Sequence, residues 1–571
     1  MKNFFPVYTR HSGCQDCYKC VRQCPVKAIR VEKQQARITE KRCVACGGCV
    51  RVCPAKAKVV RNDLGRARRL LLDPLPVYAS IAPSWIAWHP DWSLGQLAAA
   101  IRLLGFTGVS ETALGAQEVS AALAVDLEQS GPGLHISSAC PAVVDLVRKH
   151  LPHLVGNITP VASPALTHCR LLRERLGRDV AVVFIGPCVA KKNEADDNPD
   201  LMNLALTFAE LDEWLAGEGI FPARLQPGAE DRFLPRDAAE GALYPVEGGM
   251  IETLRHYGCP DTVQYQALSG LLYVKTALER LDETSFRTPF FLEALACHGG
   301  CINGPCLTGV PSPLDGTLAI RSRVSFGPQG RRQSLRVGRQ YRPAAAAVAE
   351  RTEEDIKKAL SWVGKTKPGD ELNCGGCGYE TCRQFAGALL SGDAETAMCV
   401  SYMRGIAQRK ANALLSRMPS GVAIAGEDLR IVESNEAFAN LFGEPWISLR
   451  ENIPGLAGVA LDTLFPFESL LRAVLRSGRD IRRERLAVGK KFLSAIVFSI
   501  EEHKTVGVIL EDVTLNAARR VQIASRAREV IDRNIAAVQE IASRLGEHMA
   551  DTEILLNSIA RDFEDADGEE Q

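Results

Sequence analysis

The chain has 571 residues, and its 68 Lys plus Arg balance 68 Asp plus Glu, so the formal net charge at pH 7 is zero. The length indicates three to five domains, and the charge balance provides no overall field that would attract nucleic acid or an anionic membrane surface. The most apolar stretch, 70–88, is interrupted by Asp73 and three prolines, which a membrane helix would not carry. We therefore expect no nucleic-acid partner and no membrane span.

The N-terminus, MKNFFPVYTRHSGC, lacks the apolar core and cleavage site of a secretory signal, which predicts a cytoplasmic protein. Nineteen cysteines are present, and many of them are bunched at short intervals. Because disulfides are rare in a reducing compartment, bunched cysteines are better interpreted as metal or cluster ligands. We expect sixteen of them to bind iron.

Residues 1–62 contain an internal repeat of two cysteine runs, separated by a stretch of strand character, AIRVEKQQARIT. Each run has the Cys-x2-Cys-x2-Cys-x3-Cys-Pro spacing of bacterial two-cluster ferredoxins, in which the fourth cysteine ligates the other cluster. This predicts one 4Fe-4S cluster on Cys14, Cys17, Cys20 and Cys53, and a second on Cys43, Cys46, Cys49 and Cys24. The alternative, a pair of structural zinc sites, usually has two separated pairs of thiolates. Electron transfer is the expected role.

The basic segment 61–69 is interpreted as a solvated linker, because no aromatic residues lie between its charges. Residues 70–343 then alternate strand-like runs (VYASIAP, DVAVVFIGPC, FFLEALAC) with amphipathic helical stretches at 94–104 and 165–176. That alternation predicts a mixed α/β domain. A helix-rich segment around 344–363 follows it.

Residues 344–411 form a second small cysteine module. Cys374, Cys377, Cys382 and Cys399 are accompanied by Gly375, Gly376 and Gly378, which let the backbone close around sulfur. This favours a third 4Fe-4S cluster. A zinc site remains open, because cysteine spacing alone discriminates poorly between these metals.

Residues 412–516 contain no cysteine, and short strands with an intervening helix predict a compact sensor-type α/β domain. In 517–571 apolar residues from Ile531 to Phe563 alternate at spacings of four and three, and an acidic tail follows. A heptad seam of this length favours a coiled-coil homodimer. A single helix packed on its own domain is the alternative.

Four further cysteines lie far apart in the sequence, each where a strand-like run gives way to a turn or helix. They are Cys140, Cys188, Cys297 and Cys301. Strand ends of an α/β fold converge on one crevice, so four thiolates could meet there. Each could equally be a buried structural cysteine. The remaining Cys169, Cys259 and Cys306 are expected to be structural thiols.

The central domain resembles the catalytic domain of FeFe-type hydrogenases. SSACP, GPCVAKK and LEALACHGGCING stand in the order of that family's three signature segments, and SIAPSW, ETALGAQEVS and EGGMIETL are also similar. The resemblance implies that Cys140, Cys188, Cys297 and Cys301 hold a cubane, and that Cys301 bridges it to a two-iron subsite with CO, cyanide and azadithiolate ligands. This assembly is the H-cluster.

The resemblance further implies that Lys191 hydrogen-bonds a cyanide of the subsite, as a charge-assisted contact in a dry pocket. Glu194, three residues on, is either a partner of that lysine or a surface acid. The implied reaction is reversible heterolytic cleavage of H2, with the bound cluster supplying the chemistry and the other 4Fe-4S clusters carrying electrons.

Four positions depart from the pattern of active members of the family. Ala139 stands where they have a cysteine, and an alanine cannot relay a proton. Gly186 and Leu295 replace methionines, which reshapes the pocket. His298 replaces a proline and is either a substitute proton carrier or a structural hydrogen-bonding residue. Slow turnover is therefore expected.

Residues 412–516 resemble a PAS domain, so the whole chain resembles the sensory branch of FeFe hydrogenases. The predicted architecture is multidomain α+β: a two-cluster ferredoxin fold, an α/β hydrogenase-like core, a 4Fe-4S module, a PAS domain and a coiled-coil helix. The implied partners are H2, protons, a redox partner such as ferredoxin and a separate signalling effector, under anaerobic conditions. The alternative is an iron-sulfur regulatory or electron-transfer protein that lacks the two-iron subsite and hydrogenase activity.

Overall fold

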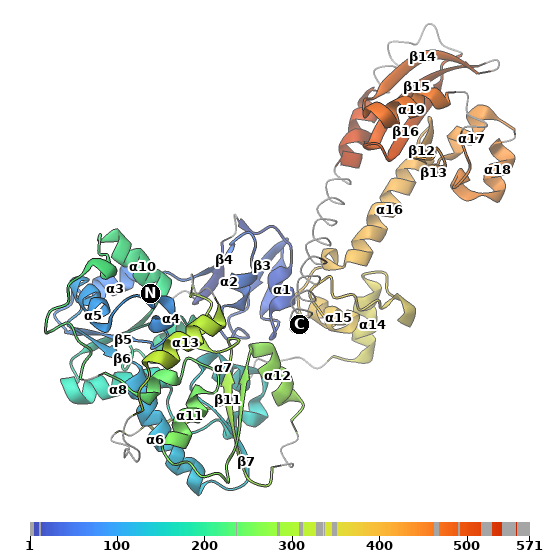
Figure 1. The fold of residues 1–571 in the computed structure, drawn as a ribbon. Helices are drawn as coiled ribbons and strands as arrows, with labels where there is room; N and C mark the ends of the chain where they lie inside the picture. Colours follow the sequence, from blue (N-terminus) through green and yellow to red (C-terminus); the bar gives the residue numbers. More distant parts are fainter. Residues whose placement is uncertain are drawn as a thin grey trace, which may run out of the picture. The chain divides into compact units, whose positions relative to one another are not determined.

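The computed structural model describes most of the chain in two compact units, residues 1–398 and 399–571 (Figure 1). Described residues are 5–10, 13–235, 237–281, 286–307, 312–326, 335, 337–344, 351–444, 446–461, 467–488, 491–514, 528–539 and 556. Within them, no helix combines the length and apolar character needed to cross a bilayer.

The N-terminal region of the first unit has the repeated architecture that its two cysteine runs predict. A two-stranded antiparallel pair joins β1 (Val7–Thr9) to β4 (Lys58–Val60), and a hairpin joins β2 (Ile29–Glu32) to β3 (Gln35–Ile38). The expected strand-like stretch between the runs is this hairpin. Two short helices, α1 (Lys19–Gln23) and α2 (Gly48–Val52), each carry the third cysteine of a run and end at the fourth.

The central region contains two parallel sheets, as the alternation of strands and helices predicts. One has the strand order β6 (Gly108–Glu111), β5 (Val77–Ile81), β8 (Ala181–Gly186), β9 (Leu204–Thr207), and the other β10 (Gln264–Ser269), β11 (Pro289–Leu295), β7 (Gly133–Ile136). All six residues of β8 are buried, as expected of a parallel strand covered on both faces. The three strand-length runs of the sequence are β5, β8 and β11.

Helices surround these sheets (Figure 1): α4 (Trp85–Trp88), α5 (Leu94–Leu103), α6 (Ala113–Gln129), α7 (Pro141–His150), α8 (Pro164–Leu176), α9 (Ala190–Asp197), α10 (Phe208–Gly217), α11 (Gly249–His256), α12 (Leu271–Glu279) and α13 (Pro313–Arg323). The two predicted helices at 94–104 and 165–176 are α5 and α8. Pro141 opens α7, and three basic residues occupy its last turn, where cations favour the helix dipole. Cys140 is thereby fixed at the start of α7.

The interpretation of 61–69 as a solvated linker is wrong. Residues Leu64–Leu70 form helix α3, whose Leu64 and Ala67 are buried in the core of the α/β region. The cause is a buried charge network: Lys192 Nζ, on α9, donates to Asp63 at 2.9 Å and pairs with Glu210 at 2.8 Å, and the Lys192 side chain is fully buried. Arg61 and Arg66 of the segment pair with Asp63 and Asp196, whereas Arg68 and Arg69 are exposed.

Breaking this network should destabilise the protein. We expect Lys192→Met to lower the free energy of unfolding by about 3–5 kcal/mol, because it leaves the Glu210 carboxylate buried without this cation and removes one of the cations that pair with buried Asp63. The transition can be followed by tryptophan fluorescence in denaturant. Arg68→Ala, which breaks an exposed pair with Glu218, is the control and should change the value by no more than about 0.5 kcal/mol.

The same network predicts a pH dependence. Burial alone would raise the pKa of Asp63, but the Lys192 and Arg61 cations hold it below its ordinary value. The Asp63 carboxylate therefore binds a proton more readily in the unfolded chain than in the folded protein. The contribution of Asp63 to the free energy of unfolding is fully present above the ordinary pKa of an aspartate and is lost as the pH falls through the lowered pKa of the folded protein. An unfolding free energy of Lys192→Met equal to that of the wild type would contradict the first expectation. An unfolding free energy that fell as steeply with decreasing pH in Lys192→Met as in the wild type would contradict the second.

The first unit ends with α14 (Glu353–Ser361) and α15 (Cys382–Leu390), and the second opens with α16 (Val400–Arg417). In the second unit, a five-stranded antiparallel sheet has the order β13 (Ile431–Ser434), β12 (Gly421–Gly426), β16 (Thr505–Asp512), β15 (Lys491–Glu501), β14 (Ile481–Val488). Helices α17 (Glu436–Phe442), α18 (Trp446–Asn452) and α19 (Glu468–Ser477) accompany it. Residues 528–539 are helical, and the rest of the predicted heptad seam, except 556, lies outside the described residues.

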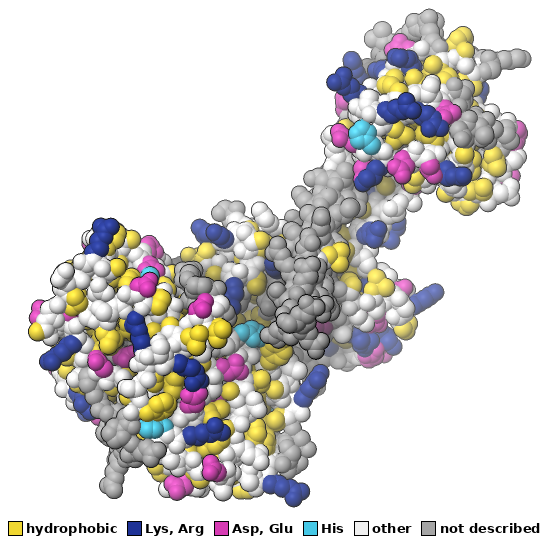
Figure 2. Space-filling view, in the orientation of Figure 1, with side chains coloured by type: hydrophobic (Ala, Val, Ile, Leu, Met, Phe, Trp, Pro, Cys, Tyr) yellow, Lys and Arg dark blue, Asp and Glu magenta, His cyan; other side chains and the backbone are white. Residues whose placement is uncertain are grey.

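Basic and acidic side chains are interspersed over the coloured residues of the face drawn in Figure 2. Blue and magenta groups lie next to one another there, and the basic ones gather into no large patch. This distribution agrees with the equal numbers of acidic and basic residues in the sequence.

Candidate iron-sulfur and catalytic site

Four cysteines that are distant in the sequence line one cavity of about 380 Å³. Cys140 follows β7 and precedes α7, Cys188 follows β8, Cys297 follows β11, and Cys301 begins a short 3-10 turn. The parallel strands of the two sheets therefore deliver all four thiols to one place. The convergence expected from strand ends is present.

The four thiols form a donor set suited to an iron-sulfur cubane. Burial and the neighbouring thiols raise the pKa of Cys188 to about 11 and that of Cys297 well above its ordinary value. The thiolate charges therefore need a cation among them, and soft thiolates favour iron-sulfur clusters. The residues fit a cubane.

The backbone conformation of Gly300 allows Cys297 and Cys301 to line the same cavity. Gly300 has φ +105°, and a Cβ at this position would lie 2.1 Å from the carbonyl oxygen of Pro245. Any other side chain would push the loop away from Pro245, so the glycine places Cys297 and Cys301 on the same cavity.

A second, larger cavity of about 660 Å³ shares the walls formed by Cys140, Cys188 and Cys301. Its wall is mostly apolar and includes Ala139 and Leu295, and the polar side chains that reach it are Ser84, Thr112, Lys191 and Tyr244. A largely dry cavity next to Cys301 is the place at which the resemblance puts a two-iron subsite.

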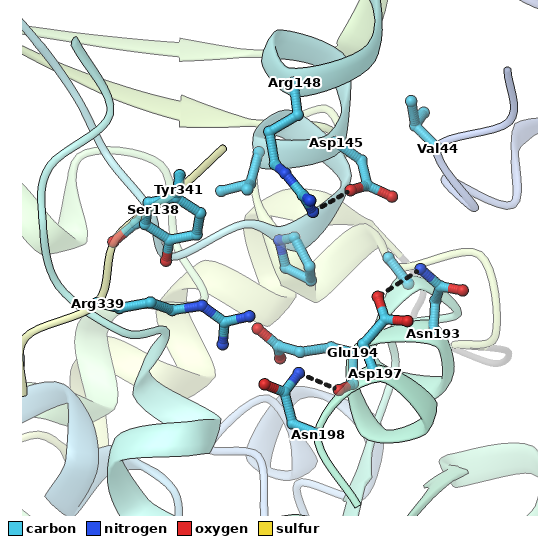
Figure 3. Close-up of a pocket in the computed structure, with 13 residues that line it drawn as sticks. Val44, Ser138, Asp145, Arg148, Asn193, Glu194, Asp197, Asn198, Arg339 and Tyr341 are labelled. Atoms are coloured by element: carbon cyan, nitrogen blue, oxygen red, sulfur yellow. Dashed lines mark hydrogen bonds and ion pairs between the residues drawn. The ribbon is translucent and has the colours of Figure 1, made fainter. Parts of the chain in front are cut away.

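Among the described residues that line this wall, Lys191 is the one Lys, Arg, Asp or Glu. Its Nζ donates to Ser163 Oγ at 3.0 Å and pairs with Glu194 Oε2 at 2.6 Å. Glu194, one helical turn further along α9, lines a polar pocket of about 430 Å³ together with Asp197 and Arg339 (Figure 3). Glu194 is thus a partner of the lysine and not an unpaired surface acid.

Two chains of hydrogen-bonded side chains begin at hydroxyl groups on the wall of the large cavity, and each ends on a backbone carbonyl among the described residues. Thr112 Oγ1 contacts Ser80 Oγ at 2.8 Å, and Ser80 continues through the ring of His168 to Ser110, which donates to the carbonyl of Leu234. Tyr244 continues through Ser120 and Thr253 to the carbonyl of Met250. A carbonyl oxygen accepts a hydrogen bond but has no proton to pass on.

The structure shows what surrounds the four residues that depart from the hydrogenase pattern. A Cβ at Gly186 would lie 2.7 Å from the ring of Phe184, so this phenylalanine fills the space, and it lines the large cavity. Leu295 and Ala139 also line it. His298 is exposed and packs edge-on against Tyr273, outside the wall, which favours the structural interpretation over a proton relay.

Two residues of the wall were missed by sequence reasoning. Phe184 belongs to an apolar strand and carries no motif of its own. Ser84 is fully buried, and its hydroxyl has no hydrogen-bond partner among the described residues, so it is available to a group in the cavity. The segment SIAPSW contains this serine, but spacing alone did not distinguish it.

The ferredoxin-type cysteines are grouped across the two runs. Cys14, Cys17, Cys20 and Cys53 line one cavity of about 350 Å³. Cys49 lies near Cys46, Cys43 and Cys24. Burial, and then the negative charge of these three thiolates, raises the pKa of the Cys49 thiol well above its ordinary value. Cys46 also lines the cavity of Cys140 and Cys301, so the second group adjoins the central site.

In the later module, Cys374 and Cys377 lie on a loop that α15 follows, and Cys382 is the first residue of that helix. Asn373 Oδ1 accepts the backbone N–H of Cys382 at 2.7 Å, and Gly375 has φ +70°. Cys399 belongs to the second unit, where it precedes α16. The three cysteines not assigned to iron, Cys169, Cys259 and Cys306, are all buried, as expected of structural thiols.

Comparisons with known proteins agree with this arrangement. Residues 75–305 match the family model of the iron only hydrogenase large subunit, C-terminal domain. Residues 6–54 match a 4Fe-4S dicluster domain, and residues 370–401 match an Fe-S cluster family.

Similarity to individual proteins is distant. Iron hydrogenase 1 of Clostridium pasteurianum is 23% identical over 256 residues, which are 37% of this chain and 45% of that protein. The periplasmic [Fe] hydrogenase large subunit of Nitratidesulfovibrio vulgaris is 25% identical over 275 residues, 39% of this chain and 65% of the relative. The chain thus spans about half to two thirds of these relatives' length.

Among solved structures, an [FeFe]-hydrogenase from Chlamydomonas reinhardtii is 16% identical, with a TM-score of 0.40, and covers 50% of this chain and 100% of its own. The family matches and the four converging cysteines lead to one conclusion. The chain is a hydrogenase-like iron-sulfur protein, and its residues 75–305 match the iron only (FeFe) hydrogenase family.

Proposed function

We propose that the protein is a sensory FeFe hydrogenase of low turnover, which cleaves or forms H2 reversibly and reports hydrogen or redox state to a separate effector. The observation that carries the proposal is the shared wall: Cys140, Cys188 and Cys301 separate a four-thiol site from a large apolar cavity that contains one lysine. When bound there, the H-cluster would supply the heterolytic chemistry of H2.

The chain's own residues hold and surround that group. Cys140, Cys188, Cys297 and Cys301 would be the ligands. The Lys191 ammonium would donate to an anionic ligand of the subsite, and Ser163 and Glu194 fix its position. The apolar remainder of the cavity wall offers few hydrogen-bonding groups to water.

Electrons would enter and leave through the ferredoxin-type clusters. Cys46, a proposed ligand of the second cluster, lines the same cavity as the ligands of the central cubane, which supports a direct electron path between them. An external redox partner such as ferredoxin would exchange electrons with the N-terminal region.

The sensory assignment is supported by two features. Ala139 offers no acidic proton to the cavity, and the hydroxyl chains from Thr112 and Tyr244 end on carbonyls, so proton delivery should be slow. The second unit's five-stranded antiparallel sheet with flanking helices supports a PAS domain at 412–516. A coiled-coil homodimer through 517–571 would complete the signalling region.

Infrared spectroscopy of anaerobically matured protein tests the proposal. We expect CO and cyanide stretching bands that shift when H2 is admitted. Absence of both bands after maturation by machinery that loads a control hydrogenase would overturn the hydrogenase assignment.

A second function is favoured by the reshaped wall. Phe184 takes the space beside Gly186, and Leu295 adds a second substitution, so the cavity could serve an iron-sulfur regulatory protein that lacks the two-iron subsite. That protein would show cubane signals and neither diatomic-ligand bands nor H2-dependent reduction.

A further inference from the structure

Lys27 lies between the second ferredoxin cluster site and the loop of the later cysteine module. Its Nζ donates to the carbonyl of Gly378 at 2.8 Å and to that of Arg22 at 3.4 Å, and it lies 5.8 Å from the centre of the Tyr379 ring. The side chain thus joins the end of α1 to the loop that bears Cys374 and Cys377.

The charge of Lys27 acts on ligands of both sites. Lys27 is the third residue after Cys24, a proposed ligand of the second ferredoxin cluster, and its Nζ donates to the carbonyl of Gly378, the residue after Cys377 of the later module. Burial lowers the pKa of this lysine, while Cys24, Glu380 and Cys377 act in the opposite direction. One ammonium therefore lies near ligands of two proposed clusters.

Other contacts hold the two loops together. Arg22 donates to the carbonyls of Gly376, at 3.2 Å, and Cys17, at 3.0 Å. A Cβ at Gly378, where φ is +93°, would lie 2.8 Å from a methyl carbon of Val21. The module loop is thus packed directly on α1, the helix that carries Cys20 and ends at Cys24.

The internal repeat provides a matched position without this contact. Lys27 is the third residue after Cys24, and Lys56 is the third residue after Cys53; both have a left-handed backbone, with φ of +45° and +49°. Lys56 is exposed, whereas Lys27 is partly buried. The two lysines are equivalent in the repeat and differ in their surroundings.

We propose that Lys27 electrostatically couples the cluster of Cys24, Cys43, Cys46 and Cys49 to the cluster of the 374–399 module, making that module a branch of the electron path. The inference rests on the iron-sulfur part of the proposed function and not on the two-iron subsite. In the branch step one electron leaves one cubane and enters the other, so that one is oxidised and the other reduced, and no bond or proton is transferred.

The physical reason is the added negative charge of a reduced cluster. A cation near both clusters stabilises the reduced form of each, and cluster potentials depend on local charge, hydrogen bonds and exposure. Removing the ammonium should therefore make both clusters harder to reduce. The first ferredoxin cluster, near Lys56, should be unaffected.

The test is an EPR-monitored redox titration of the full chain with reconstituted cubanes, without the two-iron subsite. In Lys27→Met we expect the equilibrium constant for reduction of both coupled clusters to fall about tenfold, which is 59 mV for a one-electron couple. Cys377→Ser identifies the signal of the later module by its loss. Lys27→Arg, which keeps the charge, should restore both potentials.

Lys56→Met is the matched control and should leave both coupled clusters at their wild-type potentials. Iron content and the signal of the first cluster establish that each variant is folded and loaded. The proposal is overturned if Lys27→Met shifts one coupled cluster or neither, if Lys56→Met shifts them equally, or if Lys27→Arg behaves like Lys27→Met. Failure of the hydrogenase assignment would leave this titration unchanged.

Discussion

Cys301→Ser should abolish hydrogenase activity while leaving the ferredoxin-type clusters intact. Cys301 lines both the four-thiol cavity and the large apolar cavity, as Cys140 and Cys188 also do, and the proposed function makes it the thiol that bridges the cubane and the adjoining subsite. A serine hydroxyl is a much weaker ligand for iron than a thiolate. Because loss of an outer partner of a metal site costs about 10- to 100-fold, loss of a bridging ligand should cost at least about 100-fold.

The measurement combines H2-dependent dye reduction with infrared spectra of matured protein. The CO and cyanide bands should disappear with the activity, and EPR signals of the clusters in 1–62 should remain. Cys306→Ser is the control, since Cys306 is buried five residues further along and lines neither cavity. Retained infrared bands in Cys301→Ser would refute the bridging assignment.

Local spacing predicted the ferredoxin region well, because its ligands and its turns lie within short segments. The crossed grouping of Cys53 with Cys14, Cys17 and Cys20 is reproduced by the cavity that they line. The central site required more, since Cys140 and Cys301 are brought together only by the order of strands in two sheets. Strand ends indicated a crevice, but the sequence could not specify which strands adjoin.

The residues that were missed have no local signal. The burial of segment 61–69 depends on Lys192, which lies far away in the sequence, so its charges gave the appearance of a solvated linker. Phe184 lines the cavity because Gly186 leaves room for its ring, a relation between two residues on one strand that hydrophobic patterning does not distinguish. Ser84 contributes a buried hydroxyl from a short, mostly apolar segment in which nothing distinguishes it from Ser80.

Ala139→Cys should increase the turnover of the matured protein. The Ala139 side chain lies on the wall of the large cavity, next to the proposed ligand Cys140, and a thiol there would provide an acidic proton where the wild type has a methyl group. Positioned acid-base groups contribute about 10²- to 10⁴-fold in enzymes. Because the rest of the proton path is unchanged, we expect a gain below that range, of about 10- to 100-fold in H2 oxidation by dye reduction.

Two controls separate proton delivery from a general effect of adding a thiol to the cavity. Ala116→Cys places a thiol on the same wall from α6 and not at the residue before Cys140, and should give no gain. Ala139→Ser supplies a hydroxyl that is a weaker acid, so its gain should be smaller than that of cysteine. Equal rates for Ala139→Cys and wild type, with infrared bands showing full loading of both, would mean that proton supply at this position does not limit turnover. The slow reaction expected of a sensor would then have to originate in the electron path or in the subsite environment set by Phe184 and Leu295.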